Sequence, residues 1–297
     1  MTTATQTQTT RHTRISPSHA LKDIAVITRR NLLRNIRLPQ LLIFATVQPV
    51  MFLLLFNYVF GGAIGGAIPP IAQGEYINWL LPGLLIQVAA FGAGQTALGL
   101  TEDLSKGVID RFRSLPMARS AVLAGRTLSD LIRNGFVIGL MVVIGFLMGF
   151  RYQTNFMAFL AGLAVAMVFS YALSWIMATI GLAVKNPEAA QSAVFLPVFP
   201  LVFASSVFVP TDTMPAWLQA FAENQPITVT VNALRGLMLG RESLADYLPG
   251  MNTDQLAQAV ANAPTVEGQV LLSLGWAVAI MLIFVPLAIR VYRKTVS

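Results

Sequence analysis

The chain alternates long apolar stretches with shorter polar segments from about residue 40 to its C-terminal end. Six stretches are long and free of acidic and basic residues, at about 40–60, 80–100, 134–150, 156–184, 190–209 and 268–289. A bilayer core about 30 Å thick needs about 20 predominantly apolar residues per helix, a length that helices of soluble cores rarely sustain. The pattern therefore predicts an all-α, polytopic membrane protein with six transmembrane helices.

The basic residues lie on alternate connecting segments. All but three of the 20 Lys and Arg residues occur before the first stretch, in the second and fourth loops, and in the C-terminal tail. The three on the other side are Arg151, Arg235 and Arg241. Cytoplasmic loops of membrane proteins carry the excess of Lys and Arg, so the distribution predicts that both termini are cytoplasmic. It also accounts for the net charge of +7 without a nucleic-acid partner.

Composition divides the chain into three parts. Residues 1–17 include a Thr- and Gln-rich start and are expected to form a disordered cytoplasmic tail. Residues 18–38 carry apolar residues at helical spacing with Lys and Arg mostly on the other face, which predicts an amphipathic interface helix. That helix either only anchors the chain or also contacts a cytoplasmic partner. Residues 39–295 form the six-span domain, with a cytoplasmic loop at 101–130 and an outer segment at 210–266.

The cytoplasmic loop begins with a second amphipathic pattern. Its apolar residues recur near one helical face, at Leu104, Val108, Phe112 and Leu115. Glu102 and Asp103 precede them, at the predicted N-terminal end of the helix, where the helix dipole favours negative charge. Pro116 follows the last of them. The pattern predicts a short helix outside the membrane, which either lies on the interface or docks onto a soluble partner.

The outer segment contains a mostly apolar stretch, 226–240, that is too short and too polar to span a bilayer. It is expected to form a re-entrant or a surface helix that ends at Gly240. Arg235 within it would be costly at bilayer depth, so it should lie at the headgroup level or be paired. The prolines just before this segment, at 197, 200 and 210, indicate either a kinked helix beside a permeation path or irregular packing.

Several classes of function lack the residues that they require. Cysteine is absent and both histidines lie near the N-terminus, so thiolate and intramembrane His metal sites are excluded. The chain has no P-loop, no nucleophile–base pair and no metal-binding cluster. The six stretches also contain none of the Asp, Glu, Lys or His residues that ion-coupled carriers use. We therefore expect no catalytic, cofactor-binding or metal-binding residue in this chain, and no enzymatic activity of its own.

Two motifs accompany the six-span pattern. The first is Glu102-Asp103…Gly107…Arg111…Ser114-Leu-Pro116, followed by Gly125-Arg126, and the second is Asn224-Gln-Pro226…Ala233-Leu-Arg235…Gly240. With these motifs the chain, over about residues 20–295, resembles the membrane subunit of type 2 ABC exporters, in particular the daunorubicin-resistance permease group. The resemblance implies two permease subunits, identical or related, and two separate P-loop ATPase subunits that bind ATP and Mg.

The resemblance also implies roles for particular segments. The segment 102–116 resembles the helix that couples the permease to the ATPase, and 18–37 resembles the connecting interface helix. The coupling residues would be Glu102, Asp103, Leu104, Gly107, Val108, Arg111, Phe112, Leu115 and Pro116. Family substrates include hydrophobic drugs, lipids and glycans, which agrees with the amides, hydroxyls and aromatic residues within the stretches.

The sequence thus favours a permease of an ATP-driven exporter in a bacterial plasma membrane. Its substrate, hydrophobic or amphipathic, would move between two permease subunits, although ordinary helix packing uses the same residue types. The candidate path residues are Gln48, Asn57, Gln87, Phe91, Gln95, Phe195, Phe203, Ser205 and Ser206. A self-contained secondary carrier or facilitator is the alternative, and a membrane enzyme acting on lipid is a third hypothesis.

Overall fold

The computed structural model describes residues 17–37, 39–61, 76–108, 119–184, 186–240 and 265–296. These residues form helices joined by short turns, with no strand among them. The helices are α1 (Pro17–Arg37), α2 (Pro39–Leu55), the π-helical turn η1 (Phe56–Phe60), α4 (Tyr76–Ser105), α6 (Arg119–Leu147), α7 (Phe156–Val184), α8 (Pro187–Phe203), the 3-10 turn η3 (Thr211–Thr213), α9 (Ala216–Asn224), α10 (Pro226–Leu239) and α13 (Val266–Val296). All but the last residue of the predicted tail at 1–17 lies outside the described residues.

Each predicted apolar stretch lies largely within a helix, although several helices extend beyond the predicted bounds. Four are long and apolar enough to cross a membrane, at Tyr76–Ser105, Ala121–Leu147, Phe156–Val184 and Val266–Lys294. Two further apolar helices, Ala45–Val59 and Pro187–Phe203, are shorter than about 20 residues. The all-helical fold is therefore confirmed for the described residues, whereas a count of six spans stays a prediction.

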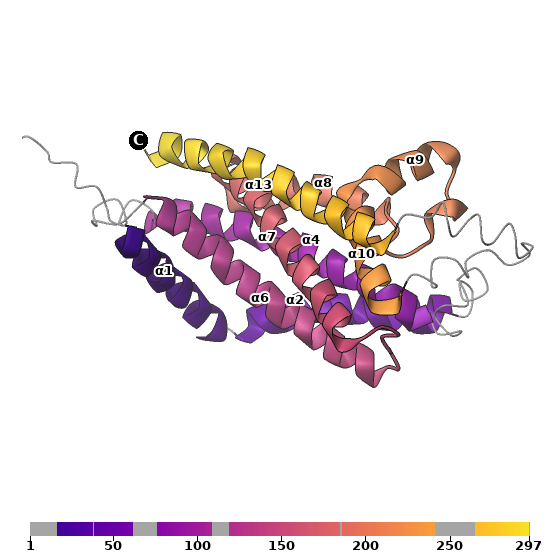
Figure 1. Cartoon of the computed structure of the whole chain (residues 1–297). Coiled ribbons are helices and arrows are strands. Elements are labelled where there is room, and N and C mark those ends of the chain that lie inside the picture. Colours follow the sequence, from indigo (N-terminus) through magenta and orange to yellow (C-terminus); the bar gives the residue numbers. More distant parts are fainter. Residues whose placement is uncertain are drawn as a thin grey trace, which may run out of the picture.

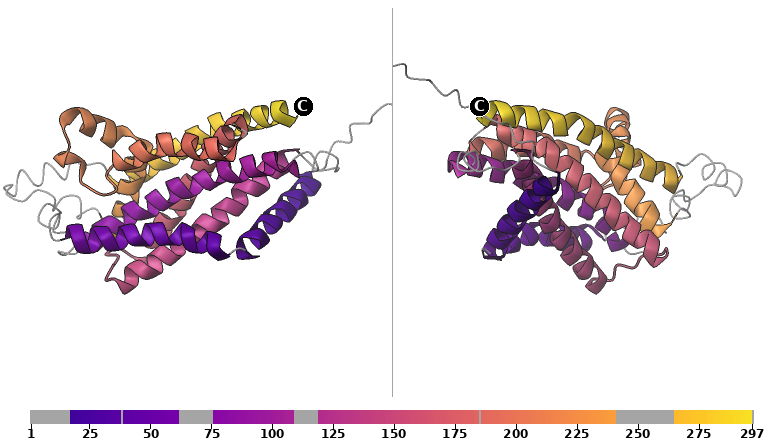
Figure 2. Two further views of the ribbon diagram at one scale, coloured as in Figure 1. Left: turned by 180° about the vertical axis from the view of Figure 1, so that it is seen from behind. Right: turned by 60° about the vertical axis from the view of Figure 1, so that its left-hand side comes forward.

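The helices run lengthwise through an elongated bundle (Figure 1). The start of α1, the end of α4, the start of α6 and the end of α13 lie together at one end of the molecule, on the left in Figure 1. Helix α9 lies at the opposite end, and the views in Figure 2 show the same separation. The two ends of the described chain thus lie on the same side of the bundle.

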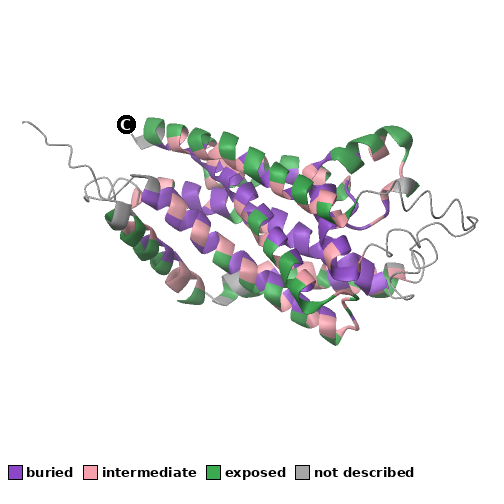
Figure 3. Cartoon of the chain, in the orientation of Figure 1, coloured by how far each residue is buried: buried purple, intermediate pink, exposed green. Residues whose placement is uncertain are grey.

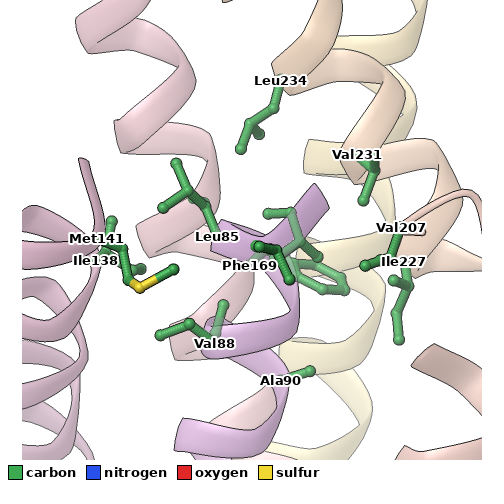
Figure 4. Close-up of a cluster of buried hydrophobic side chains, with 14 of the residues drawn as sticks. Leu85, Val88, Ala90, Ile138, Met141, Phe169, Val207, Ile227, Val231 and Leu234 are labelled. Carbon is green, nitrogen blue, oxygen red and sulfur yellow. The ribbon is translucent and has the colours of Figure 1, made fainter. Parts of the chain in front are cut away.

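Helix α4 forms the centre of the bundle, and α13 lies at its edge (Figure 3). In the most apolar part of α4, 89% of the residues are buried, whereas in the most apolar part of α13 only 17% are buried. Leu84 and Leu85 of α4 are completely buried, in one cluster with Met141 of α6 and Phe169 of α7 (Figure 4). An apolar helix that the protein leaves uncovered requires lipid or another subunit around it, because water would oppose its exposure.

The contact between α4 and α7 depends on a close backbone approach. A Cβ atom added to Gly181 would lie 2.6 Å from the carbonyl oxygen of Ala97. Small residues permit such approaches, and packing of this kind stabilises helix pairs in a membrane, where apolar burial contributes little. The crossing therefore requires glycine at position 181.

Candidate functional site

Four of the predicted path residues line one cavity inside the bundle. They are Gln48 of α2 and Gln87, Phe91 and Gln95 of α4, and the cavity has a volume of about 80 Å³. A larger cavity of about 480 Å³ adjoins it, since Gln48 and Gln95 line both. Both side chains are exposed, whereas Gln87 is buried and its Oε1 has no hydrogen-bond partner among the described residues. The structure thus brings these four residues together, which does not by itself assign them a role in transport.

Helix α6 contributes polar side chains that the sequence analysis did not select. Arg133 and Asn134 line the smaller cavity, and Arg126 and Arg133 line the larger one. Arg126 Nη2 donates to the carbonyl oxygen of Gln95 at 3.3 Å, and Arg133 Nη2 donates to that of Gly92 at 3.0 Å. The spacing 126, 130, 133 and 134 places these groups on one helical face, and that periodicity was the signal available in the sequence.

The candidate span that contains these residues begins earlier than predicted. The third apolar stretch was expected to start at 134, whereas the helical candidate span runs from Ala121 to Leu147. It includes Arg126, Asp130 and Arg133, all buried. The stretch 134–150 contains no acidic residue, as predicted, whereas the helix that carries it also contains Asp130. The helix extends through these residues because Arg126 is paired with Asp130 and both arginines donate to carbonyls of α4 instead of facing the solvent of a loop.

Two glycines of α4 make room for the polar face of α6. A Cβ atom on Gly99 would overlap the guanidinium of Arg126, and one on Gly92 would overlap the side-chain amide of Asn134. Asn134 Nδ2 in turn donates to Ser170 Oγ of α7 at 2.9 Å. These glycines therefore allow α4 to pack closely against the polar side chains of α6.

The larger cavity is strongly basic. It lies among α1, α2, α4 and α6 and is lined by Arg34, Asn35, Ala45, Gln48, Gln95, Leu98, Gly99, Glu102, Lys106, Arg126 and Arg133. Four of these side chains are cationic and only Glu102 is acidic. Glu102 lies 3.6 Å from Lys106, so this carboxylate is already shared with one of the cations.

Helix α1 is attached to the end of α4 by a buried carboxylate. Arg30 Nη2 and Arg34 Nη1 each lie 3.7 Å from an oxygen of Asp103, which is 7% exposed. Partial burial lowers the pKa of the Arg30 guanidinium, and the neighbouring Asp103 opposes that effect. Thr28 Oγ1 also donates to the carbonyl oxygen of Gly125 at 3.2 Å, which joins α1 to α6.

The predicted coupling helix does not begin where the sequence suggested. Glu102, Asp103 and Leu104 belong to the last turn of α4, which ends at Ser105. Gly107 then adopts a φ of 64°, a left-handed conformation that terminates helices. The expectation that Glu102 and Asp103 begin a separate helix is therefore wrong, because α4 continues through them. Val108 is described, whereas Arg111, Phe112, Leu115 and Pro116 lie outside the described residues.

The other predicted path residues lie along α8 and around its C-terminal turn. Phe195 packs on Phe91 with ring centroids 6.2 Å apart, and Phe203 packs on Phe208 at 5.1 Å. Phe195 and Phe203 are 52% and 37% exposed, so a second surface can still contact them. Asn57 lies apart, in the π-helical turn η1.

Ser205 and Ser206 are buried and have structural contacts. Ser205 Oγ accepts from the backbone N–H of Val207 at 3.2 Å, and Ser206 N donates to Thr228 Oγ1 at 3.2 Å. The carbonyl of Ser206 accepts from Arg235 Nη2 at 2.6 Å. None of these contacts places either serine in the two cavities, so the structure does not bring them to the four path residues.

The stretch 226–240 forms α10, which packs inside the bundle against α4, α7 and α13. Arg235 is buried, donates to the carbonyls of Trp79 and Ser206, and stacks 3.5 Å above the Trp79 ring centre. The expectation that this arginine is paired is confirmed, and so is the helix end at Gly240, which has a φ of 93°. Most residues of α10 are buried in the bundle, and the choice between a re-entrant helix and one at the outer surface stays a prediction.

Metal chemistry has no support in the described part of the chain. No group of three or more His, Cys, Asp or Glu side chains gathers there in a way that could hold an ion. The acidic side chains nearest to the cavities, Asp103, Asp130 and Glu102, each contact a basic side chain. The carboxylates around the cavities are therefore engaged in ion pairs in the described structure.

Comparison with known proteins identifies the family. The model of the ABC-2 type transporter family matches residues 22–239. Daunorubicin resistance ABC transporter permease protein DrrB1 of Streptomyces coeruleorubidus is 36% identical over 70% of this chain and 72% of its own length. Probable doxorubicin resistance ABC transporter permease protein DrrC of Mycobacterium tuberculosis is 24% identical over 69% and 72%, respectively. Putative transport permease ycf38 of Cyanophora paradoxa is 24% identical over 73% and 74%.

The region that matches the family model includes α1 from Lys22 onward, the residues that line the two cavities, and α10. The resemblance to type 2 ABC exporters drawn from the two sequence motifs is thereby confirmed. The family match and the four helices able to span a bilayer together identify a multi-pass membrane protein. The chain belongs to the ABC-2 type transporter family and is a transmembrane permease of an ABC exporter.

Proposed function

We propose that this permease moves a hydrophobic or amphipathic substrate out of the cytoplasm or inner leaflet of a bacterial plasma membrane. Two separate P-loop ATPase subunits bind ATP and Mg and supply the energy, so the chain has no ATPase site of its own. The names of its relatives, permeases of drug-resistance ABC transporters, support this division of labour. In this proposal α2 with η1 and α8 complete a set of six spans, and both termini are cytoplasmic.

One observation carries the proposal: the first residues of the predicted coupling segment line the larger cavity. Glu102 and Lys106 line it, and the coupling residues continue from there to Pro116. A displacement of that segment by an ATPase would move the end of α4. Because Gln95 and Gly99 lie on the same helix, such a movement would change the shape of the cavity.

Helix α1 provides a second mechanical connection. Its Arg30 and Arg34 hold Asp103, and its Thr28 holds the backbone of α6 at Gly125. An ATPase that touches α1 and the coupling segment together would therefore act on both walls of the cavity. This arrangement favours the hypothesis that α1 contacts a cytoplasmic partner over that of a simple anchor.

A second permease subunit, identical or related, would cover the aromatic side of α8. Phe195, Phe199 and Phe203 form a continuous stack, with centroids 5.0 and 4.3 Å apart, and all three are more than one-third exposed. Exposed aromatic surface is typical of interfaces and of sites for apolar ligands. In the proposal the substrate leaves along this side, between the two permeases.

The test is purification of the chain from its native membrane, followed by identification of bound proteins and an ATPase assay. We expect a P-loop ATPase to co-purify and to be lost when Phe112 and Leu115 are both changed to Asp. Changing the exposed Trp217 and Phe221 of α9, at the opposite end of the bundle, to Asp provides a control for added charge in apolar positions. A chain that purifies alone, in a detergent that preserves other membrane complexes, would contradict the proposal.

A self-contained carrier is the alternative that the sequence left open, and the relatives do not favour it. Asp130 and two arginines are buried within a candidate span, and ion-coupled carriers use such groups. Transport by the purified chain in liposomes, driven by a proton or sodium gradient without ATP, would support this candidate. Transport that requires the ATPase and ATP would exclude it.

A further inference from the structure

The larger cavity holds more positive charge than its carboxylates can balance. Arg34, Lys106, Arg126 and Arg133 line it. Of the nearby acidic groups, Asp130 is paired with Arg126, Asp103 is shared by Arg30 and Arg34, and Glu102 is paired with Lys106. None of these ion pairs involves Arg133. Asp130, the carboxylate that acts on Arg133 from one turn away, is already paired with Arg126, so the cations around the cavity outnumber the carboxylates.

Arg133 has an unused hydrogen-bond donor. Its side chain is nine-tenths buried and borders both cavities. Its Nη2 donates to the carbonyl oxygen of Gly92, whereas its buried Nε has no hydrogen-bond partner among the described residues. A buried charged group that lacks such a partner is costly, and arginine nitrogens suit the oxygens of phosphate or carboxylate groups.

The adjoining cavity is less polar and lies deeper along the same helices. Pro49 of α2, Val88 and Phe91 of α4 and Val137 of α6 supply its apolar walls, next to the amides of Gln48 and Gln87. Gln95 and Arg133 border both cavities, so they lie where a charged head and an apolar body would join. The pair of cavities is therefore amphipathic, with its basic part toward the end of α4.

We infer that the joined cavities bind an amphipathic anion, with its phosphate or carboxylate group at Arg133 and its apolar part beside Phe91. This inference rests on the proposed export function and names the substrate class of that same site. The charged group of the anion lies against the Arg133 guanidinium within the larger cavity, and the exposed Gln95 lies at the boundary between the two cavities. Arg34 and Lys106 add positive potential in the same cavity. Arg126, held by Asp130, adds positive potential without being required as a direct ligand.

Binding to the purified full-length chain tests the inference without ATP or an ATPase subunit. The probes are phosphatidylglycerol and phosphatidylcholine with the same acyl chains and the same fluorescent tail label, each titrated in detergent at low and at physiological salt. We expect phosphatidylglycerol to bind about tenfold more tightly, a preference that falls as salt screens the charges. Equal affinity for the two lipids would overturn the inference.

A third probe separates a lipid head group from a free phosphate. Glycerol 3-phosphate has the anionic group without the apolar part, and it is used as a competitor against labelled phosphatidylglycerol. If the site is amphipathic, displacement needs a concentration at least about a hundredfold higher than displacement by unlabelled phosphatidylglycerol. Displacement at similar concentrations would overturn the apolar half of the inference.

Variants distinguish the cavity from ordinary lipid contact on the surface. Gln95→Glu adds a negative charge at the exposed amide that borders both cavities, and Arg133→Gln removes the cation. Each should abolish the preference for phosphatidylglycerol. The matched control is Gln191→Glu, at an exposed position of α8 that lines neither cavity, and it should retain the preference. If Arg133→Gln does not fold, Gln95→Glu alone decides, and an unchanged preference in it overturns the inference.

Failure of this inference is distinguishable from failure of the proposed function. Selective anion binding that is lost in Gln95→Glu supports the site even if no ATPase co-purifies. Co-purification of an ATPase with no selectivity for the anionic lipid supports the exporter and rejects the site. The two experiments thus have separate outcomes.

Discussion

Arg126 and Asp130 form an ion pair one turn apart on α6, with Nε 3.0 Å from Oδ2 and side chains only 7% and 2% exposed. The same guanidinium donates to the carbonyl oxygen of Gln95 on α4 and lies over Gly99. A pair within one helix thereby joins two helices, since the carboxylate orients the arginine that reaches across. The burial of both charges is tolerated because each is satisfied by the other.

Removing the carboxylate should destabilise the bundle. Asp130→Asn leaves Arg126 buried without its counter-charge, and breaking such a pair costs about 3 kcal/mol or more. We expect that decrease in the free energy of unfolding, measured by denaturant titration in mixed micelles. Glu188→Gln, at an exposed carboxylate, is the control and should change it little. Equal stability of Asp130→Asn and the parent would contradict the role assigned to the pair.

The crossing of α4 and α7 gives a second prediction. Gly181→Leu would force a side chain into the backbone of Ala97, because even a Cβ atom would lie 2.6 Å from its carbonyl oxygen. We expect loss of the folded bundle, or a loss of stability of about 3 kcal/mol, as for other severe packing errors. Gly139→Leu is the matched control, since a Cβ atom there would meet nothing within 4 Å. Thermal denaturation followed by size-exclusion chromatography measures both, and a similar midpoint for the two variants would contradict this packing.

The sequence predicted the helices well because apolar stretches of this length have few alternatives. It located α7 at 156–184 with both bounds correct, and it anticipated that α2 opens at Pro39. It also anticipated that Arg235 is paired. These features depend on composition and on local signals such as proline and glycine, which a single sequence displays directly.

The polar face of α6 was missed for a physical reason. Arg126, Asp130 and Arg133 look like residues of a cytoplasmic loop, because the sequence does not show the carbonyls of α4 to which both arginines donate. The glycines that accommodate them, at positions 92 and 99, are far away in sequence. The cavity residues Gln48 and Gln95 were selected only as polar groups in apolar stretches, and nothing local indicated that they adjoin.

The contacts of Arg235 give a third prediction. Its guanidinium donates to carbonyls on α4 and on the turn after α8, and it stacks on Trp79. Arg235→Lys keeps the charge but removes the planar group that can make these contacts together. We expect a loss of about 2 kcal/mol of stability, roughly that of one or two buried charge-assisted hydrogen bonds. Arg151→Lys, at an exposed arginine, is the control under the same denaturant titration. Comparable small losses in both variants would show that charge alone suffices at position 235.

The last prediction concerns the attachment of α1 to α4. Asp103→Asn removes the carboxylate that Arg30 and Arg34 share, yet the arginine side chains are 41% and 35% exposed, so solvent screens both pairs. The loss of overall stability should therefore stay below about 1 kcal/mol, as for other partly exposed ion pairs. Local opening of α1 should nevertheless become more frequent, because fewer contacts hold it on the bundle. Hydrogen exchange of the α1 amides, measured by mass spectrometry, should be faster in Asp103→Asn, while exchange in α7 stays unchanged. Glu102→Gln, which removes only the exposed pair with Lys106, should leave α1 exchange as it is. Equal α1 exchange in Asp103→Asn and the parent would mean that Thr28 and the apolar contacts of Ile27 with Gly125 suffice to hold α1 in place.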